Sequence, residues 1–353
     1  MRSALLHGLF MLAAGALAAW IWVDRWTPRG DAPVLLQAEI DDLTSITFRW
    51  PHGETRVTRE GEDKARVYVV TLTRSYDPAA EARVAKALAD PQTRLQLKAG
   101  KDPKEIEAAA LAAAPPAPPV TETKTFPPGL FPVAAIQKLT PFRARRSLGT
   151  SGAEQLAAMG LATPQRALTI VARGRELALD IGHETYGGQA FYARPRGDDE
   201  VFLIDAETVR TFETTPRNMM DSRIVAVPLS DVTGLELEFD GRRAAFVHRH
   251  KDQFRARFFA PADAPEQKSE PVEGLNSTFV GLKAADFLAV APPGQEVAVI
   301  RFLRGSFDPH EVRVLRNADG SGYTIRSGRW IAALSETDAR KILEEVRAAL
   351  PAG

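Results

Sequence analysis

Two histidines have the spacing at which side chains could share a metal ion. His248 and His250 flank Arg249 in a stretch that predicts a β-strand, and alternate residues of a strand point to one face. Two imidazoles placed in this way could begin a metal site. The surrounding sequence offers no obvious third ligand, and His183-Glu184 lacks the second histidine of a zinc-protease motif. We therefore expect an exposed polar strand face at 248–250 and no metal ion.

Two adjacent carboxylate pairs, Asp41-Asp42 and Asp198-Asp199, are the next candidates for chemistry. Neighbouring side chains diverge on an extended backbone, so the two acids of a pair do not share a proton. Roles in capping and in turns account for both pairs. Neither pair therefore predicts a general acid or a general base.

Composition and missing motifs exclude several classes of protein. The chain has no cysteine, which excludes disulfides, thiolate zinc sites and cysteine nucleophiles. Its 45 Lys and Arg balance 45 Asp and Glu, and this zero net charge argues against nucleic-acid binding. The hydrolase elbow, the phosphate-binding loop and the dinucleotide glycine motif are absent from the sequence. We therefore expect no catalytic residue, no cofactor and no enzymatic activity.

The N-terminal segment has the composition of a membrane span. Ala4–Val23 contains no formally charged residue, and as a helix it would cover about 30 Å, the thickness of a bilayer's hydrocarbon core. Trp20, Trp22 and Trp26 cluster at its end, and indole rings favour the membrane interface. A signal peptide cleaved near Ala16-Leu17-Ala18 is the alternative. Length and tryptophans favour a retained anchor, so we expect a single-pass inner-membrane protein with most of its chain in the periplasm.

Behind the anchor, the sequence predicts repeated small antiparallel β-sheet units, each with one packed helix. Asp42–Phe48 resembles Asp231–Leu237, and both segments are followed by a glycine turn, two more strands and a helix. We therefore expect residues 38–90 and 228–285 to share a β-β-β-α unit. A third, more divergent copy is expected from Val297.

The predicted fold class is α+β, behind one N-terminal transmembrane helix. The central part predicts four antiparallel strands joined by tight turns, followed by a short helix at Ala206–Phe212. We expect the following domains: 1–26, membrane anchor or signal; 33–148, first β-rich unit with an Ala/Pro-rich insert at 100–129; 149–227, central β-hairpin domain; 228–353, C-terminal repeat units.

Two further stretches allow a structural and a functional interpretation. Pro115–Pro119 favours a semi-rigid spacer, and a proline-rich ligand for another domain is the alternative. Arg143, Arg145 and Arg146 form a short basic run. We interpret this run as a solvated face, and a binding patch is the alternative.

Several short motifs and their order along the chain resemble those of the bacterial family called domain of unknown function 4340. The resemblance runs from about residue 35 onward, and includes an N-terminal membrane segment and the repeat opening at Asp42–Ile46. The Ala/Pro-rich insert departs from the family pattern, as does a methionine where the family often has tyrosine. The motifs are Met159-Gly160-Leu161 with Pro164, Ile181-Gly182, Gly187-Gly188, Phe191-Tyr192-Ala193 and Val201-Phe202-Leu203-Ile204.

The resemblance implies an uncharacterised envelope protein, of a kind often encoded beside ABC-type transport components. It carries no catalytic residue over to this chain. We expect a non-enzymatic, membrane-anchored extracytoplasmic accessory protein that docks to an envelope complex such as an ABC-type transporter. A periplasmic module that binds lipid or cell-wall material is the first alternative, and an enzyme of unrecognised type is the second.

Overall fold

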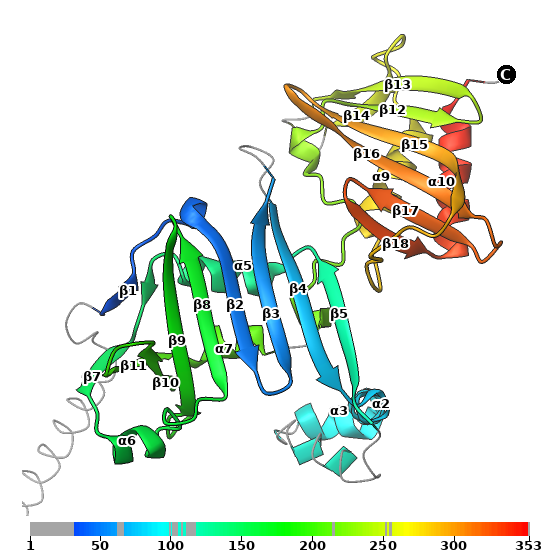
Figure 1. Cartoon of the computed structure of the whole chain (residues 1–353). Helices are drawn as coiled ribbons and strands as arrows, with labels where there is room; N and C mark the ends of the chain where they lie inside the picture. The colour runs from blue at the N-terminus through cyan, green and yellow to red at the C-terminus, as the bar shows by residue number, and fades with distance from the viewer. Residues whose placement is uncertain are drawn as a thin grey trace, which may run out of the picture. The chain divides into compact units, whose positions relative to one another are not determined.

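The computed structural model describes residues 32–61, 67–98, 100, 105–106, 109–110, 118–213, 216–250, 253 and 256–351. The expected membrane span Ala4–Val23 lies outside these residues, as do residues 101–104, 107–108 and 111–117 of the Ala/Pro-rich insert. Among the helices that are described, none is long and apolar enough to cross a membrane. The fold is α+β, and its chain forms two compact units, one holding most of residues 32–219 and the other most of residues 220–351 (Figure 1).

A nine-stranded sheet forms the centre of the first unit. Its strands follow the order β5-β4-β3-β2-β8-β9-β10-β11-β7. A separate short pair, β1 (Val34–Leu36) with β6 (Phe142–Arg143), lies beside it. The strands of the large sheet are β2 (Leu43–Trp50), β3 (Gly53–Glu60), β4 (Val67–Tyr76), β5 (Val120–Phe126), β7 (Arg146–Thr150), β8 (Arg166–Ala172), β9 (Arg175–Glu184), β10 (Ala190–Pro195) and β11 (Glu200–Asp205).

Helices α5 (Leu130–Lys138) and α7 (Ala206–Phe212) pack together and cover one face of this sheet (Figure 1). The strands bury alternate residues toward them, as a sheet with one covered face requires. Phe48, Leu168 and Ile170 are at most 1% exposed, and Phe212 of α7 is completely buried against Phe48. The unit also contains α6 (Ala153–Ala158) and α8 (Pro216–Met219).

A pair of helices extends from the end of β4. Asp77-Pro78 has the sequence pattern of a helix start, an N-cap followed by proline. α2 (Pro78–Ala89) begins there, and the Asp77 carboxylate accepts hydrogen bonds from the backbone amides of Ala79 and Ala80. α2 packs on α3 (Pro91–Lys98). None of the described side chains of α2 and α3 is buried, which sets them apart from the helices on the sheet.

A seven-stranded sheet forms the second unit, in the order β14-β13-β12-β15-β16-β17-β18. Helices α9 (Glu270–Gly281) and α10 (Glu336–Ala349) pack on each other and on one face of it (Figure 1). Ser335 caps α10 by accepting the Asp338 amide, as the sequence pattern predicts. The strands are β12 (Gly234–Phe239), β13 (Arg242–Arg249), β14 (Phe258–Pro261), β15 (Gly294–Arg304), β16 (Phe307–Asn317), β17 (Tyr323–Ser327) and β18 (Trp330–Leu334).

The two sheets share a strand order and a register. In the first, Ile46 of β2 pairs with Val57 of β3 and Ile170 of β8. In the second, Leu235 of β12 pairs with Phe246 of β13 and Phe302 of β15. Because Ile46 and Leu235 occupy the same place in the two matched segments, the expected likeness of strand order between 38–90 and 228–285 is confirmed.

The likeness extends beyond the segments that the sequence matched. Strands β8 to β11 continue the first sheet beyond β2, as β15 to β18 continue the second beyond β12. The register is also shared. Between β9 and β10, Leu179 pairs with Pro195 and Ile181 with Ala193. Between β16 and β17, Val312 pairs in the same way with Ser327, and Val314 with Ile325. The two units therefore share a β-β-β-α-β-β-β-β-α plan. The first unit adds elements to it, namely β1, β5, β6, β7, α2, α3, α6 and α8.

This plan differs from the expected one in two respects. The expected third copy from Val297 is not a sheet of its own, because β15 pairs along the whole of β12 and thereby completes the second unit. The helix that matches α9 in the first unit is α5, since α5 packs on α7 as α9 packs on α10. The α2–α3 pair is thus an addition to the shared plan. The central strands 166–205, expected in a domain of their own, lie in the same sheet as β2.

Candidate functional site

The two histidines considered for a metal site lie on different sides of the second sheet. β13 ends at Arg249, and His250 follows in the left-handed region with φ of 50°. His248 stacks on Phe259 with ring centroids 4.4 Å apart, whereas His250 lies beside Phe258, the preceding residue of β14. The expectation of an exposed polar face at 248–250 is wrong for His248, whose Nδ1 lies 2.8 Å from the Val232 carbonyl oxygen. In the part of the chain that is described, no three His, Asp or Glu residues gather as metal ligands.

The paired acids act in turns. The Asp42 carboxylate accepts the Glu39 amide at 2.9 Å and pairs with Arg173 at 2.7 Å, and the hydrogen bond from Arg173 lowers the pKa of Asp42. Asp198 accepts the Glu200 amide at 3.1 Å in the turn before β11. These contacts agree with the capping and turn roles predicted for both pairs.

The family-like motif 159–161 forms a loop that attaches to the side of β9. The carbonyl oxygen of Met159 accepts the His183 amide at 2.8 Å, and the Leu161 side chain is completely buried. A Cβ atom at Gly182 would lie 2.1 Å from the Met159 carbonyl oxygen, so only glycine allows this approach. The motif is thus explained by packing. The His183 ring packs against Gly160, where it leaves no room for a Cβ atom.

The uncovered face of the second sheet carries a continuous network of six charged side chains. Arg243 pairs with Glu238 at 3.0 Å, Arg301 bridges Glu238 and Glu311, and Arg313 bridges Glu311 and Glu296. The network crosses four neighbouring strands, β13, β12, β15 and β16. The hydrogen bond from Arg243 lowers the pKa of Glu238, and that from Arg313 lowers the pKa of Glu311, so both acids stay ionised.

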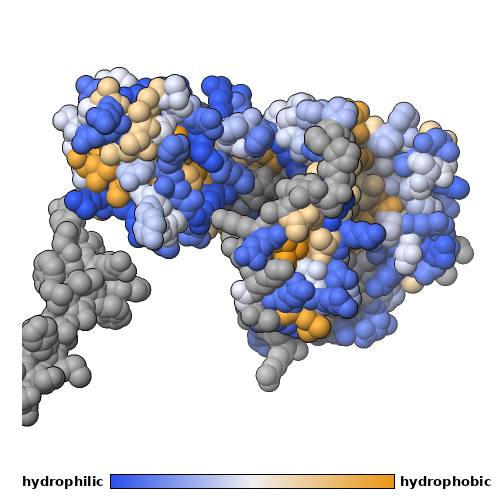
Figure 2. Space-filling model, turned by 90° about the horizontal axis from the view of Figure 1, so that it is seen from below, coloured by the Kyte–Doolittle hydropathy of each residue, from blue (hydrophilic) through white to orange (hydrophobic). Residues whose placement is uncertain are grey.

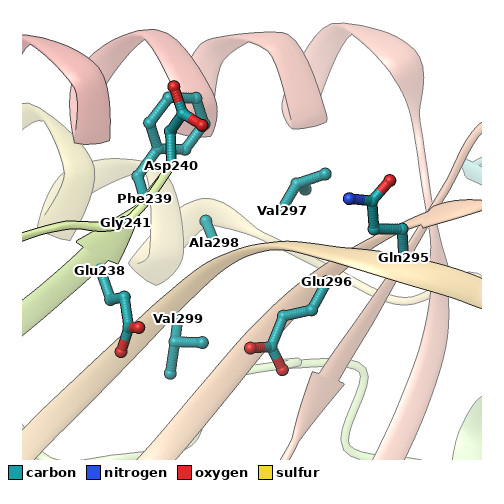
Figure 3. A pocket seen from close by; sticks show the side chains of 9 residues that line it. All are labelled: Glu238, Phe239, Asp240, Gly241, Gln295, Glu296, Val297, Ala298 and Val299. Carbon is teal, nitrogen blue, oxygen red and sulfur yellow. The ribbon is translucent and has the colours of Figure 1, made fainter.

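A depression of about 290 Å³ lies at one end of this network, between the β12–β13 turn and β15. Figure 3 shows Glu238, Val299 and Glu296 pointing to the same side of the sheet, with the valine between the two acids. A second depression, of about 230 Å³, is lined by Glu311, Arg313, Arg326 and Gly328. Glu238, Glu296 and Glu311 of these two hollows are already paired with arginines, so the hollows belong to a face whose charges largely neutralise one another.

The same positions of the first sheet carry a different surface. Arg301 and Glu311 face each other in the second sheet, and the pair in the equivalent place of the first sheet is Thr169 and Ala178. Glu236 is likewise replaced by Thr47, the partner of Thr169 on the neighbouring strand. At the centre of the first sheet's uncovered face, β2, β8 and β9 therefore carry short, uncharged side chains.

Charged side chains border this neutral centre. Arg56 lies opposite Thr47 on β3, and Glu176 lies opposite Val171 on β9. Arg49 pairs with Glu54 at 2.6 Å on one side, in the place where the second sheet has Glu238 and Arg243. Asp180 lies on the other side and pairs with Arg196 at 2.9 Å. We call the half-buried residues between them the neutral face: Ser45, Thr47, Thr58, Ala167, Thr169, Val171 and Ala178.

Sequence reasoning missed both faces. Each face is built from residues that alternate along a strand, such as Glu236 and Glu238 or Glu311 and Arg313, and this spacing is visible in the sequence. Which strands lie side by side is not visible there, so the network and the neutral face could not be assembled. The side of the molecule drawn in Figure 2 is largely hydrophilic, and its apolar spots are small and separate.

Comparison with known proteins identifies one family. Residues 134–299 match the sequence model of the family described as Domain of unknown function (DUF4340), which confirms the resemblance indicated by the motifs. The matched segment runs from α5 to β15 and includes the loop at 159–161, but it is shorter than the resemblance expected from about residue 35 onward. No curated protein and no solved structure matches the chain.

Proposed function

We propose that this chain is a non-enzymatic, membrane-anchored extracytoplasmic accessory protein whose neutral face docks to another protein of the cell envelope. The anchor in this proposal is Ala4–Val23, the uncharged and tryptophan-flanked segment of the sequence. An ABC-type transporter is the proposed partner, and this part rests on what the family resemblance implies. The docking part rests on the chain's own residues.

The observation that carries the proposal is the difference between two sheet faces of equal plan. A hydrated sheet face normally holds charged side chains, which oppose stacking against other sheets. The second sheet follows this rule with its six-charge network, and the first replaces the central Arg–Glu pair with Thr169 and Ala178. Short β-branched and alanine side chains make a flat surface that another protein can approach at little desolvation cost.

A matched pair of photo-crosslinking positions tests the docking. A photoreactive residue at Thr47 samples the neutral face, and one at Glu236 samples the equivalent position of the charged face. We expect a crosslinked envelope protein from position 47 in intact cells, and much less from position 236. Recovery of the chain alone from position 47, with photoreactive groups of several lengths, would overturn the proposal. A partner unrelated to transport would leave docking intact and remove the transporter.

The anchor is tested separately by membrane fractionation and by reading the N-terminus of the mature chain. We expect the full-length chain in the membrane fraction, released by detergent but not by alkaline carbonate. A soluble chain beginning near Ala19 would establish the signal-peptide alternative and remove the anchor from the proposed function.

A further inference from the structure

The described chain begins against the basic run of the first unit. The Pro33 carbonyl accepts the Ala144 amide at 2.9 Å, and the Ala32 carbonyl accepts a hydrogen bond from the Arg143 side chain at 3.3 Å. The run itself, 143–146, holds three exposed arginines. Any segment that precedes residue 32 therefore leaves the unit beside these positive charges.

The turn between β9 and β10 lies at the same place. Arg145 connects the two, since its backbone amide donates to the Leu203 carbonyl at 2.7 Å and its Nη1 donates to the Gln189 carbonyl at 2.6 Å. Arg210 holds the turn from its other side and donates to the Gly188 carbonyl at 3.1 Å. At the tip, Tyr186 is fully exposed, with 107% of its reference area accessible. A firmly held turn thus presents an aromatic ring to the outside.

The positive charge of this region is not compensated locally. Arg143, Arg145 and Arg146 pair with no carboxylate among the described residues. Two acids of the neighbouring elements are already engaged, Glu184 with Arg210 and Glu207 with Lys138. We call the surface made by the three arginines and Tyr186 the basic corner. The zero net charge of the whole chain conceals it.

From these contacts we infer that the basic corner rests on the membrane surface and binds anionic phospholipid headgroups. Eight residues separate Val23, the end of the expected anchor, from Ala32, and a chain of this length spans at most about 30 Å. The corner therefore lies within a short tether of the bilayer if the anchor of the proposed function is correct, and the inference rests on that proposal. Arginines near an anionic surface gain electrostatic attraction, and a tyrosine ring favours the headgroup level.

A tethered protein could also present this corner to an acidic protein, but two features favour lipid. The arginine run contacts Ala32 and Pro33, the first described residues, so with an anchor at Ala4–Val23 the bilayer would be the nearest large surface. The combination of guanidinium groups with one exposed aromatic ring matches a planar headgroup layer. Contact at this corner would restrict the orientation of the first unit relative to the bilayer.

The experiment uses the full-length chain in vesicles and exploits the absence of native cysteine. A fluorophore on Gln189→Cys samples the basic corner, and one on Glu176→Cys samples the far end of β9. Vesicles contain nitroxide-labelled headgroups in phosphatidylglycerol–phosphatidylcholine mixtures or in phosphatidylcholine alone. We expect strong quenching at position 189 only in the anionic vesicles, weakened by high salt, and little quenching at position 176 in either.

Charge reversal provides the matched control. R143E/R146E is expected to lower the quenching at position 189 to the level at position 176, since each arginine contributes on the order of a fivefold change in surface binding. R56E/R175E makes the same change of charge at two other exposed positions of the first sheet and is expected to leave the quenching unchanged.

The outcomes separate the two proposals. If the chain floats with the vesicles but position 189 is quenched no more than position 176, the anchor stands and the lipid-binding corner is refuted. If the chain fails to float with neutral vesicles, the anchor is refuted, and quenching at position 189 in anionic vesicles then shows whether the corner binds lipid without it. Quenching that survives R143E/R146E also refutes the corner.

Discussion

Single residues in this protein act through close backbone approaches and through buried polar groups. The family-like glycines are examples, because Gly182 admits the Met159 carbonyl where any Cβ would collide. The family-like motif at 159–161 therefore needs no catalytic explanation. His310, which the sequence did not single out, is an example of a partly buried polar group and lies near the start of β16.

Gly182→Ala is expected to destabilise the first unit. The added Cβ would lie 2.1 Å from a backbone oxygen, which cannot move without displacing the loop from β9, and such overpacking costs about 1–3 kcal/mol. Gly281→Ala, where nothing lies within 4 Å, is the control and should change stability little. Urea unfolding of both variants measures the difference, and equal midpoints would contradict the packing role of Gly182.

His310 is expected to make folding sensitive to acid. Burial, with the nearby Arg304 charge, lowers the pKa of His310 below its ordinary value of 6.5. The unfolded chain therefore binds a proton at His310 more readily than the folded chain does. The free energy of unfolding is highest above about pH 6.5 and falls as the pH drops toward the folded-state pKa of His310. Its Nε2 lies 2.8 Å from the Ser327 hydroxyl, which is itself buried.

His310→Gln should flatten this pH dependence between pH 7.5 and 5, because glutamine can keep a hydrogen bond to Ser327 and does not titrate. Thermal unfolding at a series of pH values measures it. His250→Gln is the control, since His250 lies outside the sheet core. A wild-type chain and a His310→Gln variant with parallel pH profiles would show that His310 does not control the acid response.

At the level of elements, the two sheets differ by what their uncovered faces carry. Register places Thr169 opposite Ala178 in one sheet and Arg301 opposite Glu311 in the other. The backbones provide the same positions, so side-chain chemistry alone distinguishes a hydrated face from a proposed docking face. Exposed ion pairs contribute little to stability, usually less than about 1 kcal/mol. The network is thus better explained by solubility than by folding.

Thr169→Arg/Ala178→Glu transfers the charged pair into the neutral face. We expect stability within about 1 kcal/mol of the wild type, because the new side chains lie on a solvated face and can pair across β8 and β9. The crosslink from position 47 should be lost, since a partner would have to bury two charges. Crosslinking and unfolding are measured on the same variant, and an unchanged crosslink would place the docking surface elsewhere.

At the scale of the whole molecule, the chain contains two compact units of one plan, each with its own core. Ile170 and Phe302 occupy equivalent places in β8 and β15, and both are buried under the helices of their own sheet. Separate cores allow separate cooperative unfolding. Because the cores are separate, the second unit can have a charged uncovered face while the first unit has the neutral face.

Ile170→Ala and Phe302→Ala should therefore destabilise different parts of the chain. Each leaves a cavity that costs about 2–5 kcal/mol. Hydrogen exchange read by mass spectrometry should show faster exchange in β2, β8 and β9 for the first variant, and in β12, β15 and β16 for the second. Equal acceleration in both sheets after either substitution would mean that the units unfold as one.

The sequence by itself determined the local features of the protein. Alternating apolar residues predicted the strands from 166 to 204, Asp77 and Ser335 marked helix starts, and the short motifs indicated the family. These features depend on neighbours in the chain, whose preferences for helix, strand or turn act over a few residues. The matched openings at Asp42 and Asp231 also predicted that two segments share a strand order.

The tertiary structure decided which distant strands are neighbours, and with them the surfaces. Periodicity tells which side of a strand is apolar, but several strands of similar pattern could pair along β2 or β12. Only long-range pairing showed that β15 completes the second sheet and that α5, rather than α2, matches α9. The same holds for Arg145 and Gln189, which are far apart in the sequence and form a hydrogen bond because β7, β11 and β10 lie side by side.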